Sequence, residues 1–148
     1  MPDIQKMKEN CDVAGLLKVC QRRDLDIELG AIAALNEIAP EVLPELISYA
    51  ETGKQLQVTA IYILGMTENP KLIPPLVGVL QNDGNFLVRK AAVRALRKMG
   101  GATVIKALRK ALYDENVEVQ REVVIALNQL GWQPTTAAEK KVAGQWKV

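Results

Sequence analysis

Histidine is absent from this chain of 148 residues, and cysteine and aromatic residues are scarce. Without histidine, neither a histidine general base nor a histidine metal ligand can be formed. The two cysteines, Cys11 and Cys20, provide neither a disulfide framework nor a zinc motif. Cys20 falls on an apolar helical position, which predicts a buried thiol and favours a reducing, cytoplasmic location.

Other signatures of chemistry or targeting are also missing. No apolar run has the length of a membrane span, and the first residues lack the apolar core of a signal peptide. Gly100-Gly101 follows a predicted helix instead of preceding one, so it does not form a phosphate loop. We therefore expect no catalytic residue, cofactor or metal, and we expect that the chain is not an enzyme. A reactive thiol at Cys11 stays open, although an inert cysteine in a turn is the favoured interpretation.

What the chain does contain is a pattern that recurs four times. The copies begin at Ile27, Leu56, Val88 and Val119, at steps of 29, 32 and 31 residues. Within each copy, similar residues lie at offsets of 4, 7, 8 and 11, which places them on one side of an α-helix. A helix that repeats at about thirty residues belongs to a unit that buries its apolar side by stacking on the next unit.

Turn and cap residues divide the chain into four helical hairpins with a short helix at each end. Asp12 is a candidate N-cap, Thr135 or Thr136 is another, and Gly131 stands where a helix C-cap glycine belongs. Pro74 and Pro75 should confine the first turn of their helix. Helices are expected at 3–10, 13–21, 25–39, 41–51, 54–67, 74–81, 85–99, 102–113, 116–130 and 135–146.

The third hairpin, LIPPLVGVLQNDGNFLVRKAAVRALRKMGG, carries the motif Val88-Arg89, Ala92, Ala95-Leu96 and Gly100 after a turn that contains Asp83. This motif resembles HEAT-like repeats, in particular the short type of phycobilisome-lyase-like proteins, and the resemblance extends over residues 3–146. It implies an all-α fold: a right-handed α-solenoid of about four HEAT-like hairpins in a single domain, 1–148. The units are expected near 12–40, 41–69, 70–101 and 102–131.

The resembled family includes scaffolds, lyase subunits and metal hydroxylases, so it indicates fold better than function. The paired histidine–glutamate iron sites of HEAT-repeat hydroxylases require histidine, which this chain lacks. We therefore expect no enzymatic activity. The one exception left open is a role as a lyase subunit, which the resemblance implies. Glu28, Gln57 and Gln120 replace the arginine of Val88-Arg89, so we expect an arginine-to-aspartate ladder between units to be incomplete.

On a helical wheel, each second helix leaves a few positions pointing away from its own hairpin. By resemblance, the second helices line the concave face, where a partner is bound. Apolar groups beside cations at these positions suit a protein interface. The alternative that the stack covers these groups by itself stays open. The predicted partner-binding residues are Leu29, Val58, Tyr62, Lys90, Arg94, Arg97, Arg121 and Ile125.

Charge is unevenly distributed along the chain. Residues 1–83 hold 7 Lys/Arg and 12 Asp/Glu, whereas residues 84–148 hold 12 and 5. The charge of solvated helix faces varies along a chain, which accounts for the uneven distribution. A basic C-terminal half can also attract an acidic partner or a polyanion. Trp132 and Trp146 are expected to seal the end of the core.

We therefore predict a non-enzymatic scaffold that binds a protein partner along the second helices. We expect the chain to be a monomer or a weak homo-oligomer and not to bind a membrane. The alternatives are nucleic-acid or polyanion binding, a less favoured role, and a lyase or chaperone subunit for a tetrapyrrole-carrying protein.

Overall fold

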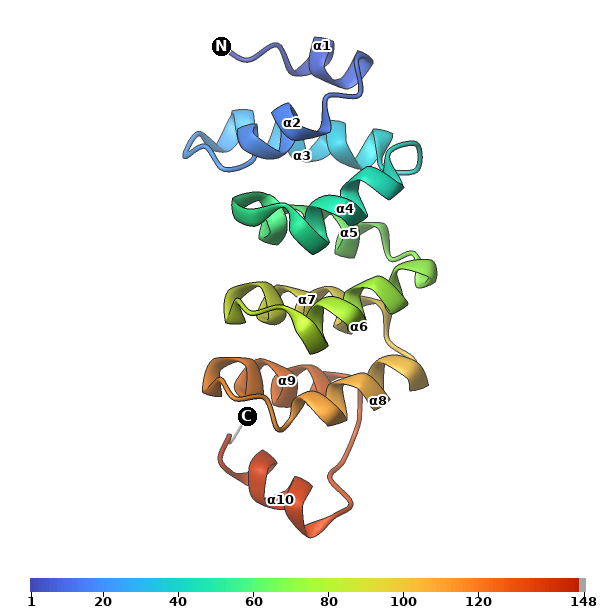
Figure 1. Ribbon diagram of the computed structural model, residues 1–148, viewed down its shortest axis with the longest axis vertical. Helices are drawn as coiled ribbons and strands as arrows, with labels where there is room; N and C mark the ends of the chain where they lie inside the picture. Colours follow the sequence, from blue (N-terminus) through green and yellow to red (C-terminus); the bar gives the residue numbers. More distant parts are fainter. Residues whose placement is uncertain (147–148) are drawn as a thin grey trace. The chain divides into compact units, whose positions relative to one another are not determined.

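The computed structural model describes residues 1–146, and in this range it consists of helices and turns without a strand (Figure 1). The chain divides into two compact units, a first unit (Met1–Thr67) and a second unit (Glu68–Val148). The all-α fold and the helical hairpins are thus confirmed. The single domain and the right-handed sense of the whole stack stay predictions. Within the described range, no helix has both the length and the apolar character needed to cross a membrane.

The first unit contains two hairpins behind a short helix. Helix α2 (Val13–Val19) packs on α3 (Leu25–Ile38), and α4 (Leu43–Thr52) packs on α5 (Gln57–Thr67), while α3 also contacts α5. The short α1 (Ile4–Glu9) lies against α2 and α3. Apolar residues at helical spacing close the core between these layers. Its fully buried side chains include Leu16, Leu35, Leu46, Ile61 and Leu64.

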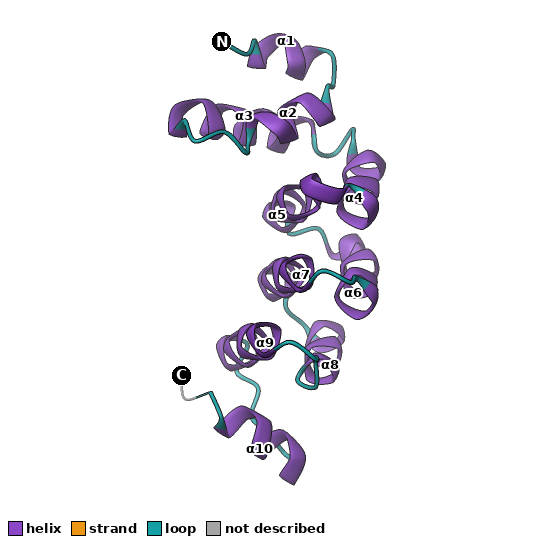
Figure 2. Cartoon of the chain, turned by 60° about the vertical axis from the view of Figure 1, so that its left-hand side comes forward, coloured by secondary structure: helices purple, strands orange, loops and turns teal. Residues whose placement is uncertain are grey.

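The second unit repeats this plan. Helices α6 (Ile73–Asn82) and α7 (Phe86–Met99) form one hairpin, and α8 (Ala102–Ala111) and α9 (Val117–Gln129) form the next. Helices α7 and α9 lie in one layer and α6 and α8 in the other, as Figure 2 shows, and α10 (Ala137–Gly144) follows. The core side chains buried between the layers include Leu72, Leu76, Leu96, Leu108 and Leu112.

The predicted helix ends at three positions are confirmed by their hydrogen bonds. The Asp12 carboxylate accepts from the Gly15 N–H at 2.9 Å, and the Thr136 hydroxyl forms a capping box with Glu139. Gly131 takes a φ of +77°, where a side chain would be strained. Around it, the N–H of Trp132 donates to the Leu127 carbonyl at 3.0 Å, as in a Schellman motif.

Several helices are shorter than expected because their ends are irregular. Lys54 has a φ of +51° and is the first residue of a single 3-10 turn, η1 (Lys54–Leu56), so α5 begins only at Gln57. Another 3-10 turn, η2 (Pro70–Leu72), leads into α6. Pro74 and Pro75 fall in the first turn of α6, where a missing backbone donor costs nothing.

Candidate functional site

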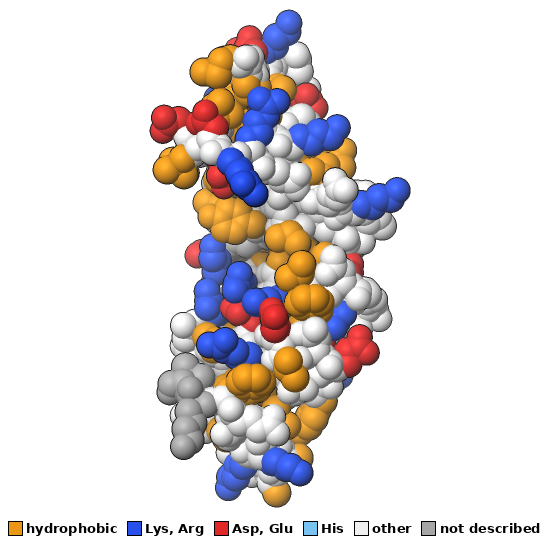
Figure 3. All heavy atoms as spheres, turned by 90° about the vertical axis from the view of Figure 1, so that its left-hand side faces the viewer, with side chains coloured by type: hydrophobic (Ala, Val, Ile, Leu, Met, Phe, Trp, Pro, Cys, Tyr) orange, Lys and Arg blue, Asp and Glu red, His pale blue; other side chains and the backbone are white. Residues whose placement is uncertain are grey.

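In the first unit, the predicted site residues lie on an exposed apolar surface formed by α3 and α5. Leu29 is 54% exposed, Val58 43% and Tyr62 50%, although each side chain is largely apolar. Helical spacing extends the surface one turn further on each helix, to Leu25 and Met66, which the sequence analysis missed although they lie four residues from Leu29 and Tyr62. We call these five residues the α3–α5 surface. Hydrophobic side chains that reach the surface among charged ones are visible in Figure 3.

A hydrogen bond connects the two helices at this surface. The amide of Asn36 on α3 lies 3.8 Å from the Met66 sulfur on α5, which fixes the register between the helices. Leu29 and Val58 occupy equivalent positions on their helices, and equivalent positions of stacked repeats face the same way. Apolar residues scattered singly need no explanation, but a group of five on adjacent helices is typical of an interaction surface.

In the second unit, the predicted cations of α7 are largely engaged by carboxylates of α9. Arg94 donates two hydrogen bonds to Glu122, from Nε at 2.9 Å and from an Nη at 3.2 Å, and Lys90 reaches Glu118 at 3.2 Å. The hydrogen bond to Glu122 raises the pKa of Arg94 above its ordinary value, and the charge of the carboxylate adds to this. These pairs join neighbouring hairpins, so Lys90 and Arg94 hold the stack together.

The remaining predicted residues of this unit differ in exposure. Arg121 is exposed, whereas Arg97 and Ile125 are half-buried. Within residues 1–146, neither Arg97 nor Arg121 forms an ion pair, so half of the four predicted cations are balanced internally. A polyanion would therefore meet less free positive charge on α7 and α9 than the sequence indicates. Replacing Arg94 by glutamate would place its carboxylate beside that of Glu122. The variant would therefore change the stability of the α7–α9 packing as well as any contact with a partner.

A buried ion pair joins α7 to the turn between α8 and α9. Arg89 donates from Nε and from an Nη to the two oxygens of Asp114, at 2.9 Å each, and a third hydrogen bond reaches the Asp83 carbonyl at 2.8 Å. Its repeat equivalents, Gln57 and Gln120, each donate to backbone carbonyls. The expected interruption of the arginine-to-aspartate ladder is thus confirmed, because an uncharged amide cannot form the ion pair that Arg89 forms with Asp114.

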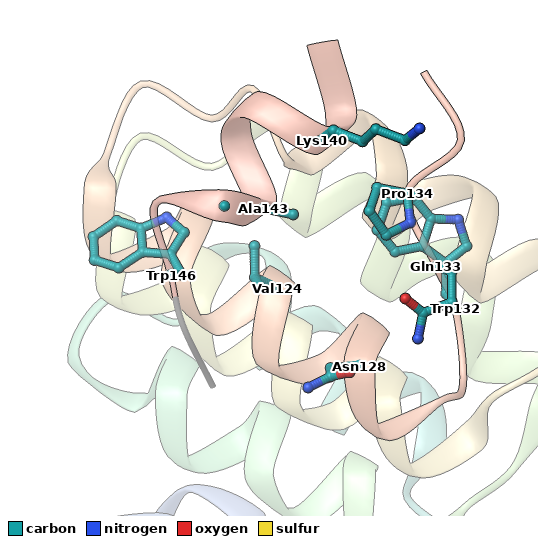
Figure 4. A pocket seen from close by; sticks show the side chains of 9 residues that line it. Val124, Asn128, Trp132, Gln133, Pro134, Lys140, Ala143 and Trp146 are labelled. Atoms are coloured by element: carbon teal, nitrogen blue, oxygen red, sulfur yellow. The ribbon is translucent and has the colours of Figure 1, made fainter. Parts of the chain in front are cut away.

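A second candidate site lies between α9 and α10, at the end of the second unit. Here a hollow of about 300 Å³ is lined by both tryptophans of the chain, by Val124 and Asn128 from α9, and by Lys140 from α10 (Figure 4). Both Trp132 and Trp146 are half-buried. The guanidinium of Arg109 lies 5.9 Å from the centre of the Trp132 ring. The tryptophans therefore line a hollow beside the last repeat helix, and their role in sealing the end of the core stays a prediction.

A short network attaches α10 to α8 beside this hollow. Arg109 of α8 donates to the Glu139 carboxylate, with Nε at 2.7 Å. The same carboxylate accepts from the backbone N–H groups of Thr135 and Thr136 at 3.0 and 3.1 Å. The Thr135 N–H contributes most to lowering the Glu139 pKa, to about 2, and burial opposes this shift. An ionised Glu139 therefore fixes the start of α10.

The thiols and carboxylates offer little metal-binding chemistry. Cys20 is buried, as predicted, and its burial raises its pKa to about 11, with Glu28 adding to the shift. Cys11 is half-buried and has a positive φ of 51°. Among the described residues there is no group of three or more Cys, Asp or Glu placed to hold a metal. The histidine–glutamate iron site of HEAT-repeat hydroxylases therefore does not fit the residues of this chain.

Comparison with known proteins adds a family and three relatives. A family model described as HEAT repeats matches residues 43–128. The chain is 31% identical over 109 residues to a deoxyhypusine hydroxylase of Rattus norvegicus and 27% identical over 131 residues to one of Danio rerio. An epoxyqueuosine reductase of Listeria monocytogenes is 37% identical over 76 residues. These alignments cover 70%, 85% and 51% of this chain.

The chain spans only 36%, 43% and 20% of the lengths of these relatives, in the same order. The predicted resemblance to HEAT-like repeats is confirmed by the family match. The prediction that the chain is not an enzyme is wrong, because the two hydroxylases point to an enzyme of the HEAT-repeat type. The absence of histidine led to that error, since it removes one kind of active site and leaves others untouched. The role as a lyase or chaperone subunit stays a prediction.

Proposed function

Because this chain belongs to the HEAT-repeat family, we propose that it is a recognition scaffold that binds a protein along the second helices of its hairpins. The observation that supports this most directly is the α3–α5 surface, where five large apolar side chains are at least 36% exposed. A partner that covers these side chains stabilises the complex by about 25 cal/mol for each Å² of apolar area removed from water. A cytoplasmic location is part of the proposal, and the free thiols suit it.

The proposal assigns different roles to the two units. The α3–α5 surface supplies the apolar anchor, because Tyr62 is an amphipathic aromatic side chain of the kind that dominates interface energies. Arg97, Arg121 and Ile125 of the second unit are proposed as further contacts, whereas Lys90 and Arg94 act through their ion pairs with α9.

The experiment is affinity purification of the tagged chain from a lysate of its own organism, followed by titration of the purified partner. Two variants weaken the anchor, Tyr62→Ala and Val58→Ser. Two matched controls change equally exposed residues of the same types elsewhere, Tyr113→Ala and Val117→Ser, at 56% and 60% exposure. We expect Tyr62→Ala to weaken binding about tenfold, as for an interface anchor, and the controls to bind as the unchanged chain does. Equal binding by anchor and control variants would remove the α3–α5 surface from the proposal.

A second candidate is catalytic, and similarity over 85% of the chain favours it. In this proposal the chain takes part in the hydroxylation of deoxyhypusine, the activity in the names of two relatives, without a histidine–glutamate iron site of its own, because it has no histidine. The test is incubation with a deoxyhypusine-containing protein, dioxygen and a reductant, with and without added ferrous iron, followed by mass spectrometry. A gain in the mass of one oxygen atom would support the candidate, and an unchanged mass, with a known hydroxylase active in parallel, would eliminate it.

A further inference from the structure

Helices α6, α8 and α10 differ in charge from α7 and α9. They hold five cations and one carboxylate, that of Glu139, which is buried and paired with Arg109. The other four cations form no ion pair with any residue of the described range; they are Lys106, Lys110, Lys140 and Lys141. By contrast, Lys90 and Arg94 of α7 are paired with carboxylates of α9. A polyanion therefore meets free positive charge on α8 and α10.

Two adjoining hollows lie along α8 and the turn after it, and Lys110 and Tyr113 line both of them. The larger, of about 400 Å³, is completed by Lys106, Arg109 and Glu139, and we call it the cationic hollow. Three cations and one carboxylate leave it with an excess of two positive charges. The smaller hollow, of about 240 Å³, extends to α6, which lies in one layer with α8 (Figure 2). Its other lining residues are Leu80, Gln81, Ala107, Ala111 and Asp114.

The smaller hollow suits a flat, uncharged ring. Its lining is mainly apolar, and its one carboxylate, Asp114, is neutralised by Arg89. The exposed amide of Gln81 offers both a donor and an acceptor, which match the edge of a nucleobase. Tyr113, at 56% exposure, presents an aromatic ring beside it. Bases of any identity can stack on such a ring, because every base has a π-face.

The cationic hollow suits phosphate groups. Lys106 and Lys110 lie about one turn apart on α8, about 6 Å along its axis, so one phosphodiester chain can reach both. Ammonium groups offer donors alone and form their strongest hydrogen bonds with anionic oxygens. The two hollows together therefore place a stacking ring next to cations.

We propose that the second unit binds single-stranded nucleic acid along α8. One base stacks on Tyr113 at the smaller hollow, and neighbouring phosphates pair with Lys106 and Lys110 at the cationic hollow. A duplex keeps its bases within its own stack, and a chain of acidic residues offers no ring to Tyr113, so a single strand matches both features. The site lies within the second unit and does not depend on partner binding at the α3–α5 surface.

Fluorescence anisotropy of labelled oligothymidylate and oligouridylate, each of about ten nucleotides, tests the proposal and distinguishes a DNA ligand from an RNA ligand. We expect saturable binding at about 50 mM salt and a steep loss of affinity toward about 200 mM. A duplex of the same length and polyglutamate serve as unlabelled competitors. Each should compete about tenfold less well than the unlabelled single strand, because neither offers a base to Tyr113.

Substitution of Tyr113 tests the stacking contact. Tyr113→Ala should weaken binding of the single strand about tenfold, whereas Tyr113→Phe should retain it. The matched control, Tyr62→Ala, changes a tyrosine of similar exposure, 50%, in the first unit and should leave oligonucleotide binding unchanged. The alanine variants have the opposite roles in the titration of a protein partner, so failure of either proposal is recognised separately.

The double variant Lys106→Gln/Lys110→Gln tests the phosphate contacts. Each contact with a single strand contributes about −0.7 to the slope of log affinity against log salt concentration, so this variant should make the slope shallower by about 1.4. The matched control, Lys71→Gln/Arg121→Gln, removes the same charge from exposed positions that line neither hollow and should keep the slope. Circular dichroism shows whether each variant keeps its helices.

Several results would overturn the proposal. One is the absence of saturable binding of both oligonucleotides at about 50 mM salt. Others are equal affinities of Tyr113→Ala and the unchanged chain, or equal slopes for the two double variants. Competition by polyglutamate or by the duplex as effective as that of the single strand would instead indicate a site for an acidic peptide or for a duplex, and would also overturn it.

Discussion

Removing the Asp114 carboxylate should destabilise the second unit more than any exposed substitution, because it leaves the Arg89 guanidinium buried without its partner. The side chain of Arg89 is 6% exposed and that of Asp114 is 10% exposed, and two hydrogen bonds of 2.9 Å join them. The hydrogen bond from Arg89 to Asp114 is also the main cause that raises the pKa of Arg89 above its ordinary value. The guanidinium stays charged even when the carboxylate is removed, because an arginine side chain cannot be deprotonated in a protein at neutral pH.

The expected cost of Asp114→Ala is about 3–5 kcal/mol, the usual range for breaking a buried ion pair on one side. This is a large part of the 5–15 kcal/mol that stabilises a typical domain. The matched control is Glu115→Ala, which removes the next carboxylate in the chain. Glu115 lies 3.7 Å from the same guanidinium but is 87% exposed, so its loss should cost less than about 1 kcal/mol.

Urea unfolding followed by circular dichroism measures these differences at pH 7. The double variant Arg89→Met/Asp114→Ala removes the uncompensated cation as well as its partner. It should be more stable than the sum of the two single losses predicts, with a coupling of about 1–3 kcal/mol. Additive losses, or equal losses for Asp114→Ala and Glu115→Ala, would refute the view that burial makes this pair important.

Two further predictions concern α10 and the α3–α5 surface. Because the folded-state pKa of Glu139 is lowered from 4.5 to about 2, its stabilising contribution is complete above pH 4.5 and lost as the pH falls toward 2. Tryptophan fluorescence should therefore report a loosening of α10 in this window, and Glu139→Gln should lack that transition; an unchanged acid profile in the variant would contradict the assignment. Leu64→Ala, in the core at 1% exposure, should cost about 2–5 kcal/mol in urea unfolding, whereas Leu29→Ala, at 54% exposure, should cost less than about 0.5 kcal/mol. Similar losses for both variants would mean that Leu29 belongs to the core.

The location of the helices could be predicted because each depends on residues that are close in sequence. The recurrence from Ile27 to Val119 marks the second helices, and α3 and α7 begin and end within one residue of the expected positions. Caps such as Asp12 and Thr136 act within three residues of themselves. The less accurate ends, at Lys54 and beyond Ala111, are places where the backbone leaves the regular helix through a 3-10 turn or a turn.

The candidate site was predicted only in part, because exposure and pairing depend on residues far apart in the chain. Leu29, Val58 and Tyr62 are exposed as expected. Arg94 is engaged by Glu122, which lies 28 residues away and was assigned no role in the sequence analysis. A wheel drawn for one helix cannot show which side chains the neighbouring helix supplies.

The enzymatic expectation failed for a different reason. The absence of histidine excludes a set of ligands and bases, and this exclusion still holds. It does not exclude other kinds of active site, and the similarity to the two hydroxylases points to an enzyme of the HEAT-repeat type. Family resemblance in a repeat protein reports the stacking pattern, and function depends on residues outside that pattern.

The sequence by itself determined that the chain forms helical hairpins of the HEAT-like type, because apolar periodicity and caps act over a few residues and repeat in every unit. Only the tertiary structure decided which charges are neutralised between α7 and α9, and that Trp132 and Trp146 line one hollow beside Lys140. The physical reason is that ion pairs and cavities arise where separate helices meet, so their members share a position in space without sharing a pattern in the chain.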